Sequence, residues 1–511
     1  MVGSRRAKRD LTCRVVLGRV VTEAARRFDE RPVVVERDGT TLSYRDLDRR
    51  SDATAAALAR RGVREGDVVA LVRPSDADWL VSMVAIAKCG AAVAGINPGL
   101  APLERARVLA RSTARLALVE TSLLDGIGDE AGEVEVIAGD PPTADPDDAP
   151  APLPHDPERM AAIVFTSGST GVPKGAVFRE AHLEAAATID GIAEGTWGGG
   201  GPMMASTPFP HVGFVMKALG YVRLGATLHT LPRWRADDVW RLVERAHLTT
   251  LGAVAPQIAL LLRSPLADEV DRSLLRTVIA GGAASPPALI SETTTRLGVT
   301  YSVRYSSTES GGVGLSVDWA PGDEPGDAIG RPRRGVEAEL RNADGTAVVE
   351  DGEPGELWVR SPAVFGGYLG DPDATAAVLV DGWWRSGDLG VNGPHGIRLV
   401  GRAKEMYVRG GYNVYPGEVE AVLRDHPDLA DVAVTPRPDD VMGEVGVAVV
   451  VVREGRPAPG IEALRAFAAE RLARWKLPDS VLEVPALPLT SMHKVDRAAL
   501  GDLPTPPTPG R

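Results

Sequence analysis

Apolar residues in the first part of the chain follow two different spacings. Residues 15–28 and 47–62 carry them every three or four positions, which predicts two helices, and Gly62 is a suitable residue to end the second. Residues 32–44 hold two short apolar runs around an Asp-Gly pair, which is typical of a hairpin turn. We therefore predict a helix, a β-hairpin and a second helix in this order.

Continuous apolar runs alternate with helical spacing in the next part. Residues 68–74 and 91–98 predict two buried strands, and residues 77–91 predict the helix between them. Strand, helix and strand at this distance are typical of a parallel, doubly wound sheet. Residues 139–157 are rich in Pro and Asp and predict a surface connection without a regular element. The fold class that this part predicts is α/β.

Two later strands end in small and polar residues. Residues 274–289 and 299–312 each predict a strand that runs into a Gly- or Ser-rich turn. Such strand ends are where a doubly wound sheet usually binds its ligand. Beyond Gly330, short strands and turns without long helices predict a small β-rich subdomain. Residues 421–503 mix strands with helices and are sufficient for a small α+β domain of their own.

Size and composition exclude several classes of protein. A chain of 511 residues is too long for one ordinary core, so two or more domains are expected. Its net charge of -12 argues against non-specific nucleic-acid or anionic-membrane binding as the main activity. The two cysteines, Cys13 and Cys89, lack metal-ligand spacing and suit a reducing compartment. Arg14 and Arg19 interrupt the N-terminal apolar stretch, and no stretch approaches the ~20 apolar residues of a membrane span. We expect a cytoplasmic protein with no nucleic-acid partner and no integral membrane association.

The stretch IVFTSGSTGVPKGAVF, residues 163–178, is a candidate phosphate-binding loop. Its small and hydroxyl-bearing residues are Thr166, Ser167, Gly168, Ser169, Thr170 and Gly171, followed by Lys174. Glycines let the backbone approach a polyphosphate, while amides and an ammonium group donate hydrogen bonds to it. Pro173 before the lysine and Gly175 after it depart from the Walker pattern. By itself the run is also compatible with a flexible surface turn between two strands.

Five separated blocks of sequence together resemble one family. They are TSGSTGVPKG (166–175), YSSTE (305–309), SGDLG (386–390), GRAKEMYVRGGYNVYP (401–416) and PLTSMHKVDR (488–497). In this order and spacing they resemble the adenylate-forming enzymes, which include acyl- and aryl-CoA synthetases, adenylation domains of peptide synthetases, and luciferases. The match spans nearly the whole chain. It implies a large N-terminal adenylation domain, residues 1–403, of doubly wound sheets with a small β-rich subdomain, and a small mobile α+β C-terminal lid domain, residues 404–511.

The resemblance implies an acid–thiol ligase that uses ATP and Mg²⁺. A carboxylate would attack the α-phosphate of ATP to give an acyl-adenylate and pyrophosphate, and the acyl group would pass to the thiol of CoA. Because two anions must meet, the enzyme's task is mainly charge neutralisation and positioning. The alternative is a stand-alone ligase that loads an acyl or aminoacyl group onto a carrier-protein phosphopantetheine. A non-catalytic nucleotide sensor of the same fold is disfavoured by the intact acidic and lysine positions below. The oligomer is expected to be a monomer or a homodimer.

The family's nucleotide contacts correspond to residues of several blocks. The loop from Thr166 to Gly171 would hold the β- and γ-phosphates, with Lys174 either steadying the loop or meeting phosphate. Glu309 would bind Mg²⁺, which usually takes one or two protein carboxylates. Thr308 would hydrogen-bond the α-phosphate. The adenine would lie between Tyr305 on one side and a wall formed by Gly281, Gly282 and Ala283.

The remaining family positions fall in the last third of the chain. Asp388 would accept both ribose hydroxyls, although an aspartate in a Gly-flanked turn is often only a turn former. Arg402 would make a second ribose or phosphate contact. Lys494 would bridge the carboxylate, the α-phosphate and the ribose. It follows His493, where the family commonly has Gly, so the shape of its loop is less well defined than its role. Lys404 would be the hinge for rotation of the C-terminal domain, and Gly410 and Gly411 would line the thiol tunnel.

The acyl pocket is predicted around residues 208–217, 252–256, 281–285 and 305–309. His211 would be a gate beside the carboxylate, or else a packed core histidine. An apolar wall would comprise Val212, Gly213, Val254 and Ala283. Ser306 stands where many relatives have Gly, which favours a small or polar acid. No acidic residue is clearly placed to bind an amine, so an amino-acid substrate is less favoured.

Overall fold

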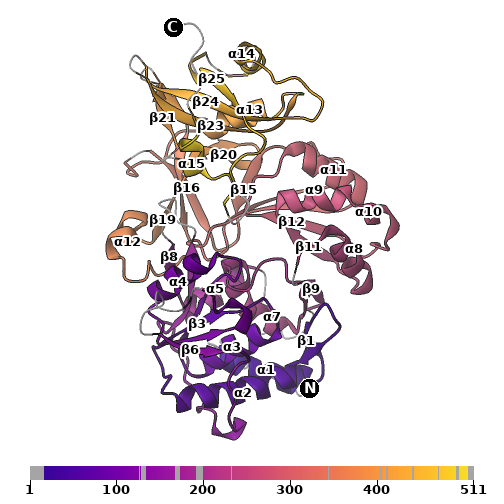
Figure 1. Ribbon diagram of the computed structural model, residues 1–511, viewed down its shortest axis with the longest axis vertical. Helices are drawn as coiled ribbons and strands as arrows, with labels where there is room; N and C mark the ends of the chain where they lie inside the picture. The colour runs from indigo at the N-terminus through magenta and orange to yellow at the C-terminus, as the bar shows by residue number, and fades with distance from the viewer. Residues whose placement is uncertain are drawn as a thin grey trace, which may run out of the picture. The chain divides into compact units, whose positions relative to one another are not determined.

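The computed structural model describes residues 17–504 except 126, 128–133, 167–172, 191–199, 232, 343, 403–404, 410–411, 440–441, 470, 473 and 491–493 (Figure 1). It divides the chain into two compact units, residues 1–338 with 359–384, and residues 339–358 with 385–511. These units do not meet at the domain boundary that we expect between residues 403 and 404. The expected boundary marks a hinge, and it stays a prediction. Among the described residues, no helix is both long and apolar enough to cross a membrane.

The first unit begins with the predicted helix, hairpin and helix. These elements are α1 (Leu17–Phe28), β1 (Pro32–Val35), β2 (Thr41–Ser43) and α2 (Tyr44–Arg60). Gly39 takes a φ of +91° in the turn and Gly62 a φ of +80° after α2, so both positions need the freedom of glycine. The hydroxyl of Ser43 accepts a hydrogen bond from the amide of Asp46 and caps α2. β9 (Pro202–Met204) and β10 (Thr227–His229) complete a small sheet in the order β2-β1-β10-β9.

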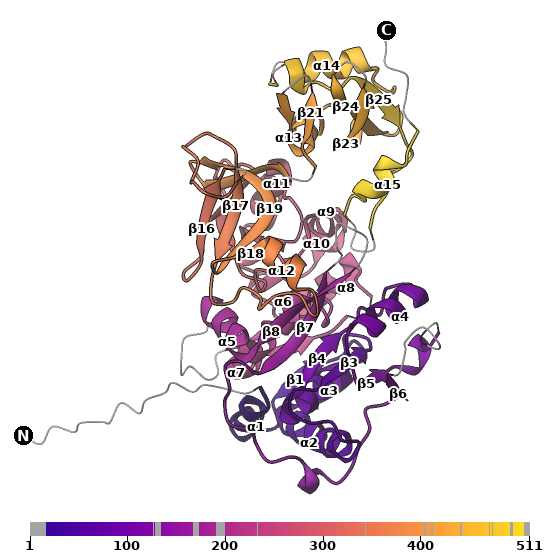
Figure 2. The same ribbon diagram turned by 90° about the vertical axis from the view of Figure 1, so that its left-hand side faces the viewer.

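A six-stranded sheet follows, with helices on both of its faces (Figure 2). Its strands are β3 (Val68–Val72), β4 (Ala92–Gly95), β5 (Leu116–Val119), β6 (Glu135–Ala138), β7 (Met160–Thr166) and β8 (Lys174–Arg179). They lie in the order β6-β5-β3-β4-β7-β8, and all neighbours are parallel except β7 and β8. α4 (Pro102–Arg111) lies opposite α2 and α3 (Ala77–Lys88). The doubly wound sheet predicted from residues 68–98 is therefore confirmed.

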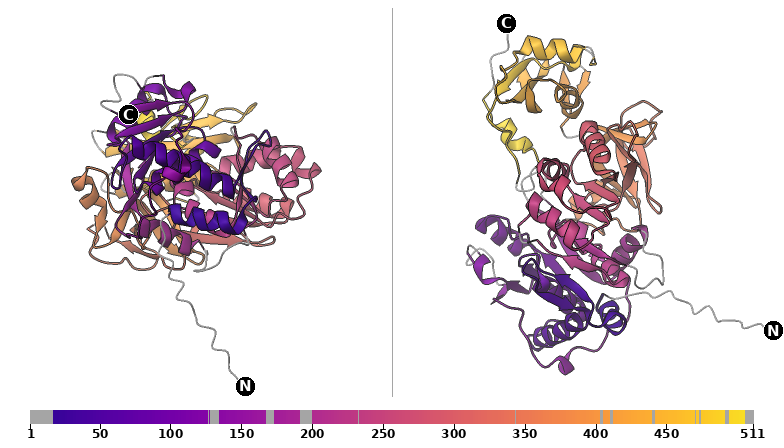
Figure 3. Two further views of the ribbon diagram at one scale, coloured as in Figure 1. Left: turned by 90° about the horizontal axis from the view of Figure 1, so that it is seen from below. Right: turned by 90° about the vertical axis from the view of Figure 1, so that its right-hand side faces the viewer.

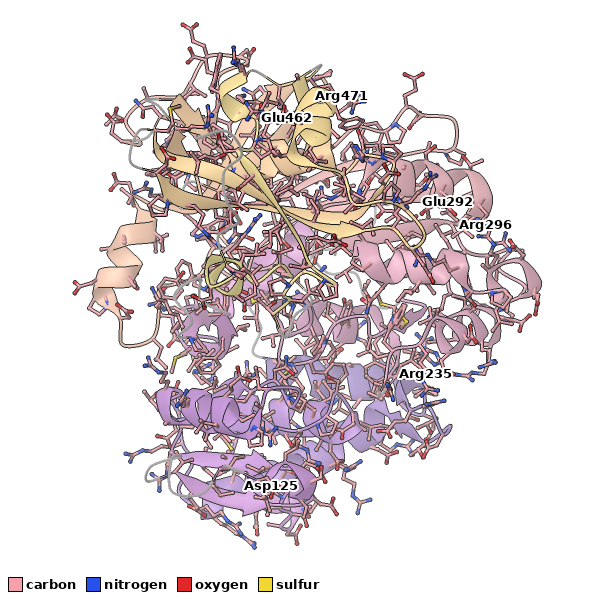
Figure 4. The ribbon with its side chains drawn as sticks, turned by 45° about the horizontal axis from the view of Figure 1, so that its top comes forward. Asp125, Arg235, Glu292, Arg296, Glu462 and Arg471 are labelled. Atoms are coloured by element: carbon pink, nitrogen blue, oxygen red, sulfur yellow. The ribbon has the colours of Figure 1, made fainter. Side chains whose placement is uncertain are left out.

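A second group of strands carries its own helical layer. The strands are β11 (Thr250–Ala253), β12 (Thr277–Gly281), β13 (Thr300–Tyr305), β14 (Leu315–Trp319) and β15 (Ala328–Pro332), of which the first three are parallel. The helices are α8 (Ala236–Arg245), α9 (Ala255–Arg263), α10 (Leu266–Glu269) and α11 (Pro287–Leu297), drawn in rose in Figure 3. Trp240 and Tyr301 are among the side chains buried between the two layers. On α11, Glu292 and Arg296 are exposed and point away from this core (Figure 4), while Thr293 is buried.

Shorter elements connect these layers. They are the helices α5 (Glu180–Ile189), α6 (Val212–Val215), α7 (Ala218–Leu224) and α12 (Pro372–Val378), the 3₁₀ turns η1 (Thr121–Leu123) and η3 (Pro146–Asp148), and β18 (Leu379–Val380). The η3 turn lies in the connection expected to hold no regular element, because Asp145 caps it and Pro146 fixes its first φ.

The second unit contains the β-rich region and the C-terminal α+β region that the sequence predicts. The first has β16 (Glu337–Arg341), β17 (Gly355–Arg360), β19 (Trp383–Gly393) and β20 (Gly396–Arg402), in the order β20-β19-β17-β16. The second has β21 (Tyr407–Arg409), β22 (Tyr412–Val414), β23 (Leu429–Asp439), β24 (Gly443–Val452), β25 (Ser480–Glu483), α13 (Pro416–Leu423), α14 (Ile461–Ala469), η4 (Arg474–Lys476) and α15 (Arg497–Gly501). The SGDLG block forms part of β19, and only Gly387 within it has a positive φ, +72°. Asp388, for which a turn-forming role was the alternative, therefore occupies a strand position.

One buried cap in the first unit makes stability depend on pH. The carboxylate of Asp76 accepts a hydrogen bond from the amide of Trp79 at 2.8 Å and caps α3. Burial raises the pKa of Asp76 from its ordinary 3.8 to about 6. A raised carboxyl pKa contributes stability that is present below the unfolded value and is lost as pH rises through the folded value. The ionised cap is therefore destabilising at neutral pH.

Asp76→Asn should raise the stability of the protein by about 1–3 kcal/mol at pH 7.5, because asparagine caps equally well and carries no buried charge. The gain should shrink as pH falls from 6 toward 4. Unfolding midpoints of wild type and variant, measured across this range, test it. The same exchange at Asp371, the cap of α12, is the control. A gain that does not change with pH would show that ionisation is not its cause.

Candidate functional site

The candidate phosphate loop is closed by a β-hairpin. Thr166 ends β7, Lys174 begins β8, and the two are register partners at the mouth of the loop. The hydroxyl of Thr166 donates to the carbonyl of Lys174 at 3.4 Å. Pro173 is described, but the predicted phosphate ligands Ser167, Gly168, Ser169, Thr170 and Gly171 lie outside the described residues. The hairpin therefore fixes where the loop begins and ends.

Lys174 and Glu309 are connected through one tyrosine. The Lys174 ammonium lies 5.1 Å from the ring centroid of Tyr368, within the range of a cation–π interaction. The Tyr368 hydroxyl donates to Oε1 of Glu309 at 2.8 Å. Burial and the adjoining Glu309 carboxylate both raise the pKa of Tyr368, which keeps the phenol protonated as a donor. The side chains predicted for phosphate and magnesium are thus joined in one chain of contacts.

The backbone around Tyr368 explains how it reaches this position. Residues 366–369 run beside β8, with the amide of Gly366 donating to Val177 and that of Leu369 donating to Gly175. The amide of Phe365 donates to the carbonyl of Glu309 at 2.9 Å. The same short segment is therefore tied to the β7–β8 hairpin on one side and to the turn that carries Glu309 on the other.

The turn after β13 is held by its own serines. The amide of Ser307 donates to the hydroxyl of Ser310 at 3.0 Å, and the amide of Ser310 donates to the hydroxyl of Ser307 at 3.1 Å. The amide of Gly311 closes the turn on the carbonyl of Thr308. A Cβ on Gly311 would lie 2.1 Å from the carbonyl oxygen of Ala363, so only glycine fits there. This rigid turn positions Thr308 and Glu309.

The carboxylate of Glu309 suits a Mg²⁺ ion whose other ligands come mainly from the substrate. Within the described ranges, no group of three or more His, Cys, Asp or Glu side chains is arranged to hold a metal without other ligands. Glu309 offers one half-exposed carboxylate, and one of its oxygens is oriented by Tyr368. Mg²⁺ commonly takes one or two protein carboxylates and completes its shell with water and phosphate oxygens. A single oriented carboxylate therefore suits it.

The glycines at the end of β12 form the part of the predicted adenine wall that has no side chains. Gly282 has a φ of +77°, and both Gly282 and Ala283 are exposed. A Cβ on Gly281 would lie 3.3 Å from the carbonyl oxygen of its strand partner Arg304. A Cβ on Gly282 would lie 3.9 Å from Cγ1 of Val254, so this part of the predicted adenine wall adjoins the predicted acyl pocket.

His211 is the N-cap of α6, and its imidazole is half-exposed. The amide of Gly213 donates to His211 Nδ1 at 3.1 Å, so the neutral ring carries its proton on Nε2. This arrangement favours the gate over the packed core histidine. Val212 is buried, and its Cγ2 lies 3.5 Å from the position of a Cβ on Gly312. Gly312 therefore adjoins Val212 of the predicted acyl pocket, a position that the sequence did not indicate.

In the second unit, Asp388 and Arg402 are register partners on β19 and β20. Nε of Arg402 donates to Oδ1 of Asp388 at 2.8 Å. The Asp388 side chain is largely buried, while that of Arg402 is 55% exposed. The amide of Asp388 is held by the hydroxyl of Ser386 at 2.9 Å. The structure thus brings together Asp388, predicted to bind ribose, and Arg402, predicted to bind ribose or phosphate, and the guanidinium orients the carboxylate.

Lys494 is an exposed residue of the same unit. The amide of Thr490 donates to the carbonyl of Lys494 at 2.7 Å, and the amide of Lys494 donates to the hydroxyl of Thr490 at 3.3 Å. Just beyond it, Arg497 is anchored to Glu420 of α13 by an ion pair of 2.5 Å. The chain is therefore fixed at Arg497, while Lys494 itself is exposed. His493, Lys404, Gly410 and Gly411 lie outside the described residues.

The residue that the sequence analysis missed is Tyr368. It lies in the run VFGGYLG (364–370), which matches neither a strand nor a helix pattern and carries no acidic or basic group. Its contacts come from residues 59 positions earlier in the chain for Glu309 and still further for Lys174. No local spacing signals such a partner.

Models of known families match most of the chain. Residues 21–369 match the AMP-binding enzyme, and residues 418–494 match the AMP-binding enzyme C-terminal domain. The chain is 33% identical over 476 residues to indoleacetate–CoA ligase from Aromatoleum aromaticum, covering 90% of this chain and 92% of that protein. It is 33% identical over 477 residues to a feruloyl-CoA synthase from an Amycolatopsis species, covering 92% and 95%.

A solved structure of similar fold contains a reaction intermediate. It is o-succinylbenzoate CoA synthetase from Bacillus subtilis in complex with its acyl-adenylate. The TM-score is 0.81 and the identity 25%, over 95% of this chain and 98% of that one. The likeness extends over both compact units and not over one of them alone.

Proposed function

Because the chain belongs to the AMP-binding enzymes of the adenylate-forming superfamily, in the acyl-CoA synthetase family, we propose that it activates a carboxylic acid with ATP and transfers the acyl group to CoA. The products of the first step are an acyl-adenylate and pyrophosphate, and the product of the second is a thioester. The observation that carries the proposal is the chain of contacts from Lys174 through Tyr368 to Glu309. It supports one polyphosphate–magnesium site built from the hairpin and the turn after β13.

The residues of the first unit hold the leaving group and the metal. The loop from Thr166 to Gly171 grips the β- and γ-phosphates, and Lys174 steadies the loop at its mouth. Glu309 holds Mg²⁺, which neutralises phosphate charge when bound. Thr308 donates to the α-phosphate. Tyr305 and the wall of Gly281, Gly282 and Ala283 enclose the adenine.

The carboxylate to be activated lies beside His211. The proton on Nε2 makes that nitrogen a hydrogen-bond donor, so the imidazole orients an anionic oxygen without itself being charged. Val212, Gly213, Val254 and Ser306 shape the space beyond. The acids named for the relatives, indoleacetate and ferulate, carry aromatic rings. Aromatic acids therefore belong in the first substrate panel for this protein.

The residues of the second unit have proposed roles of their own. Asp388 accepts the ribose hydroxyls, and Arg402 holds the Asp388 carboxylate in place while adding positive charge. Lys494 supplies the mobile charge that lets the carboxylate approach the α-phosphate. Its exposed position suits a residue that enters the site only for the first step.

The two steps use two orientations of the C-terminal domain. We place the hinge at Lys404, so that residues 1–403 and 404–511 move as the adenylation domain and the lid. In the second orientation, Gly410 and Gly411 line the tunnel for the thiol. Alternation of this type is a hinge-driven domain rotation. CoA is the acceptor in this proposal, the compartment is the cytoplasm, and the oligomer is a monomer or homodimer.

Tyr368→Phe should raise the Mg²⁺ concentration needed for half-maximal ATP binding about tenfold, because a hydrogen bond that orients a metal ligand contributes 10–100-fold to metal affinity. Calorimetric titration of ATP at several Mg²⁺ concentrations measures this without turnover. Tyr221→Phe is the control, since this half-buried tyrosine of α7 belongs to the same unit. Unchanged magnesium dependence would remove Tyr368 from the metal site.

The experiment that tests the function is acid-dependent exchange of labelled pyrophosphate into ATP. Short-chain, long-chain, aromatic, dicarboxylic and amino acids form the panel. An acid that supports exchange is then offered with CoA or with a phosphopantetheinylated carrier protein. A thioester with CoA is the expected result. Transfer to the carrier protein alone would show that the carrier, and not CoA, is the acceptor. Absence of exchange with every acid would favour a nucleotide sensor.

A further inference from the structure

The segment that carries Tyr368 is bounded by two glycines with positive φ. Gly367 has a φ of +123° and Gly370 a φ of +64°, which glycine adopts readily and other residues rarely. The carbonyl of Gly367 accepts from the amide of Val177 at 2.9 Å, so one side of the segment is paired with β8. Glycines on either side of a residue leave its backbone free to rotate. A precise position of the Tyr368 ring therefore needs a further restraint.

Thr375 of α12 supplies a restraint on the backbone of Tyr368. The amide of Tyr368 donates to Oγ1 of Thr375 at 2.8 Å, and this hydroxyl donates in turn to the carbonyl of Asp371 at 2.8 Å. A hydroxyl has one proton and two lone pairs, so it can make both bonds at once. The amide of Asp371 donates to the carbonyl of Tyr368 at 3.2 Å. The tyrosine is thereby tied to the first turn of α12.

The helix α12 itself does not build the core. It has seven residues and none of them is buried (Figure 2), and a helix this short is marginal by itself. Asp371 caps it by accepting from the amide of Ala374 at 2.9 Å. Thr375 is half-buried, and a Cβ on Gly367 would lie 2.8 Å from its Cγ2, so the helix packs closely against the glycine. The contacts of Thr375 with the tyrosine segment therefore point to a role outside the core.

The restraint reaches the carboxylate of Glu309 in two steps. Thr375 holds the backbone of Tyr368, and the Tyr368 hydroxyl donates to Oε1 of Glu309 at 2.8 Å. The Lys174 ammonium lies 5.1 Å from the centroid of the same ring. A hydrogen bond from an outer residue orients a metal ligand, so a shift of the ring changes how the carboxylate is presented. A residue that fixes the ring acts on the metal without touching it.

We propose that Thr375 is a positioning residue for magnesium and acts through Tyr368 on Glu309. This inference rests on the proposed function, in which Glu309 holds the metal, and it extends that site to α12. The threonine keeps the phenol directed at Oε1, so that the carboxylate is oriented before the metal arrives. Thr375 touches neither nucleotide nor acid. Its effect is on the Mg²⁺ concentration at which ATP binds.

The test uses variants that change the hydroxyl and little else. Thr375→Val removes it and keeps a β-branched side chain, whereas Thr375→Ser retains it. The control is Thr188→Val in α5, because the Thr188 hydroxyl donates to the carbonyl of Glu184 at 2.9 Å, four residues earlier, as Thr375 does to that of Asp371. Tyr368→Phe and the double variant Tyr368→Phe/Thr375→Val complete the set.

The readouts are calorimetric binding of ATP over a range of Mg²⁺ concentrations, kcat for pyrophosphate exchange at saturating Mg²⁺, and the unfolding midpoint. Thr375→Val should raise the Mg²⁺ concentration for half-maximal ATP binding about three- to fivefold, because the amide of Tyr368 loses its acceptor and the ring is held less closely. Thr375→Ser should stay within about twofold of wild type because it keeps both hydrogen bonds. Thr188→Val should change nothing.

The double variant decides the route of the effect. It should need the same Mg²⁺ concentration as Tyr368→Phe alone, because a residue that acts through the phenol has nothing left to position once the hydroxyl is gone. At saturating Mg²⁺ the kcat of Thr375→Val should fall by no more than about twofold, since the bound metal is the same. A purely structural threonine would lower kcat and the unfolding midpoint without moving the magnesium dependence.

Three results would overturn the assignment of Thr375. They are unchanged magnesium dependence in Thr375→Val or in Tyr368→Phe, weaker ATP binding of Thr375→Val by the same factor at every Mg²⁺ concentration, and a double variant in which the two effects multiply. The binding measurement separates this inference from the function. A shifted magnesium dependence without exchange for any acid would contradict the ligase and keep the positioning role, whereas normal exchange with unshifted dependence would do the reverse.

Discussion

Replacing Lys494 by alanine should lower acyl-adenylate formation by at least 10²–10³-fold and leave thioester formation from supplied acyl-adenylate nearly unchanged. The first step brings a carboxylate to a phosphate, and the loss of one positioned charge at such a centre has about this cost. In the second step the acyl group is already activated, and the lysine has no anion to stabilise. Pyrophosphate exchange measures the first step, and CoA thioester formation from synthetic adenylate measures the second.

The exposed position of Lys494 makes this variant interpretable. Lys494 bonds to Thr490 only through its own backbone amide and carbonyl in these two hydrogen bonds, so the alanine should keep them and should not unfold the domain. Arg456→Ala, which removes one exposed positive charge from the same unit, is the control. Equal loss of both half-reactions would contradict the two-orientation mechanism, and normal exchange would remove Lys494 from the first step.

Glu309→Gln should lower pyrophosphate exchange by about 10²–10³-fold, because the metal loses its protein carboxylate while the side chain keeps its size. The amide oxygen can still accept the hydrogen bond from Tyr368, so the turn should keep its shape. High Mg²⁺ should recover only part of the rate. Exchange rates over a range of Mg²⁺ concentrations, together with ATP binding by calorimetry, test this.

Glu324→Gln provides a matched control for charge, since this glutamate is exposed in the same unit. It should behave as wild type in both measurements. A Glu309→Gln protein with normal exchange and normal magnesium dependence would show that another group holds the metal.

Local spacing was sufficient for most helices and strands. α2 and α3 follow from apolar residues at helical spacing, and β3 and β4 follow from continuous apolar runs, because each of these signals is decided within a few residues. Local residues do not decide between strand and turn for the SGDLG block. The flanking glycines are typical of a turn. The block forms a strand because β19 pairs with β20, whose partner residues lie more than ten positions away.

The candidate site was predictable only where residues carry distinctive chemistry. Glu309, Asp388 and Lys494 could be chosen because the resemblance assigns them roles. Tyr368 could not, since what distinguishes it is a partner that is close in space and distant in sequence. A phenol that orients a carboxylate is recognised from tertiary contacts and not from spacing along the chain.

The first unit is discontinuous in sequence, and this bears on how the protein can be dissected. Residues 359–384 return to it after an excursion into the second unit, and they bring Tyr368 beside β8 and Glu309. A fragment that stops at residue 338 would leave the edge of β8 without its neighbour and Glu309 without its hydrogen-bond donor. A protease cut within residues 339–358 would leave residues 359–384 covalently linked only to the second unit. The smallest piece that keeps the magnesium carboxylate in its native surroundings therefore extends to residue 384.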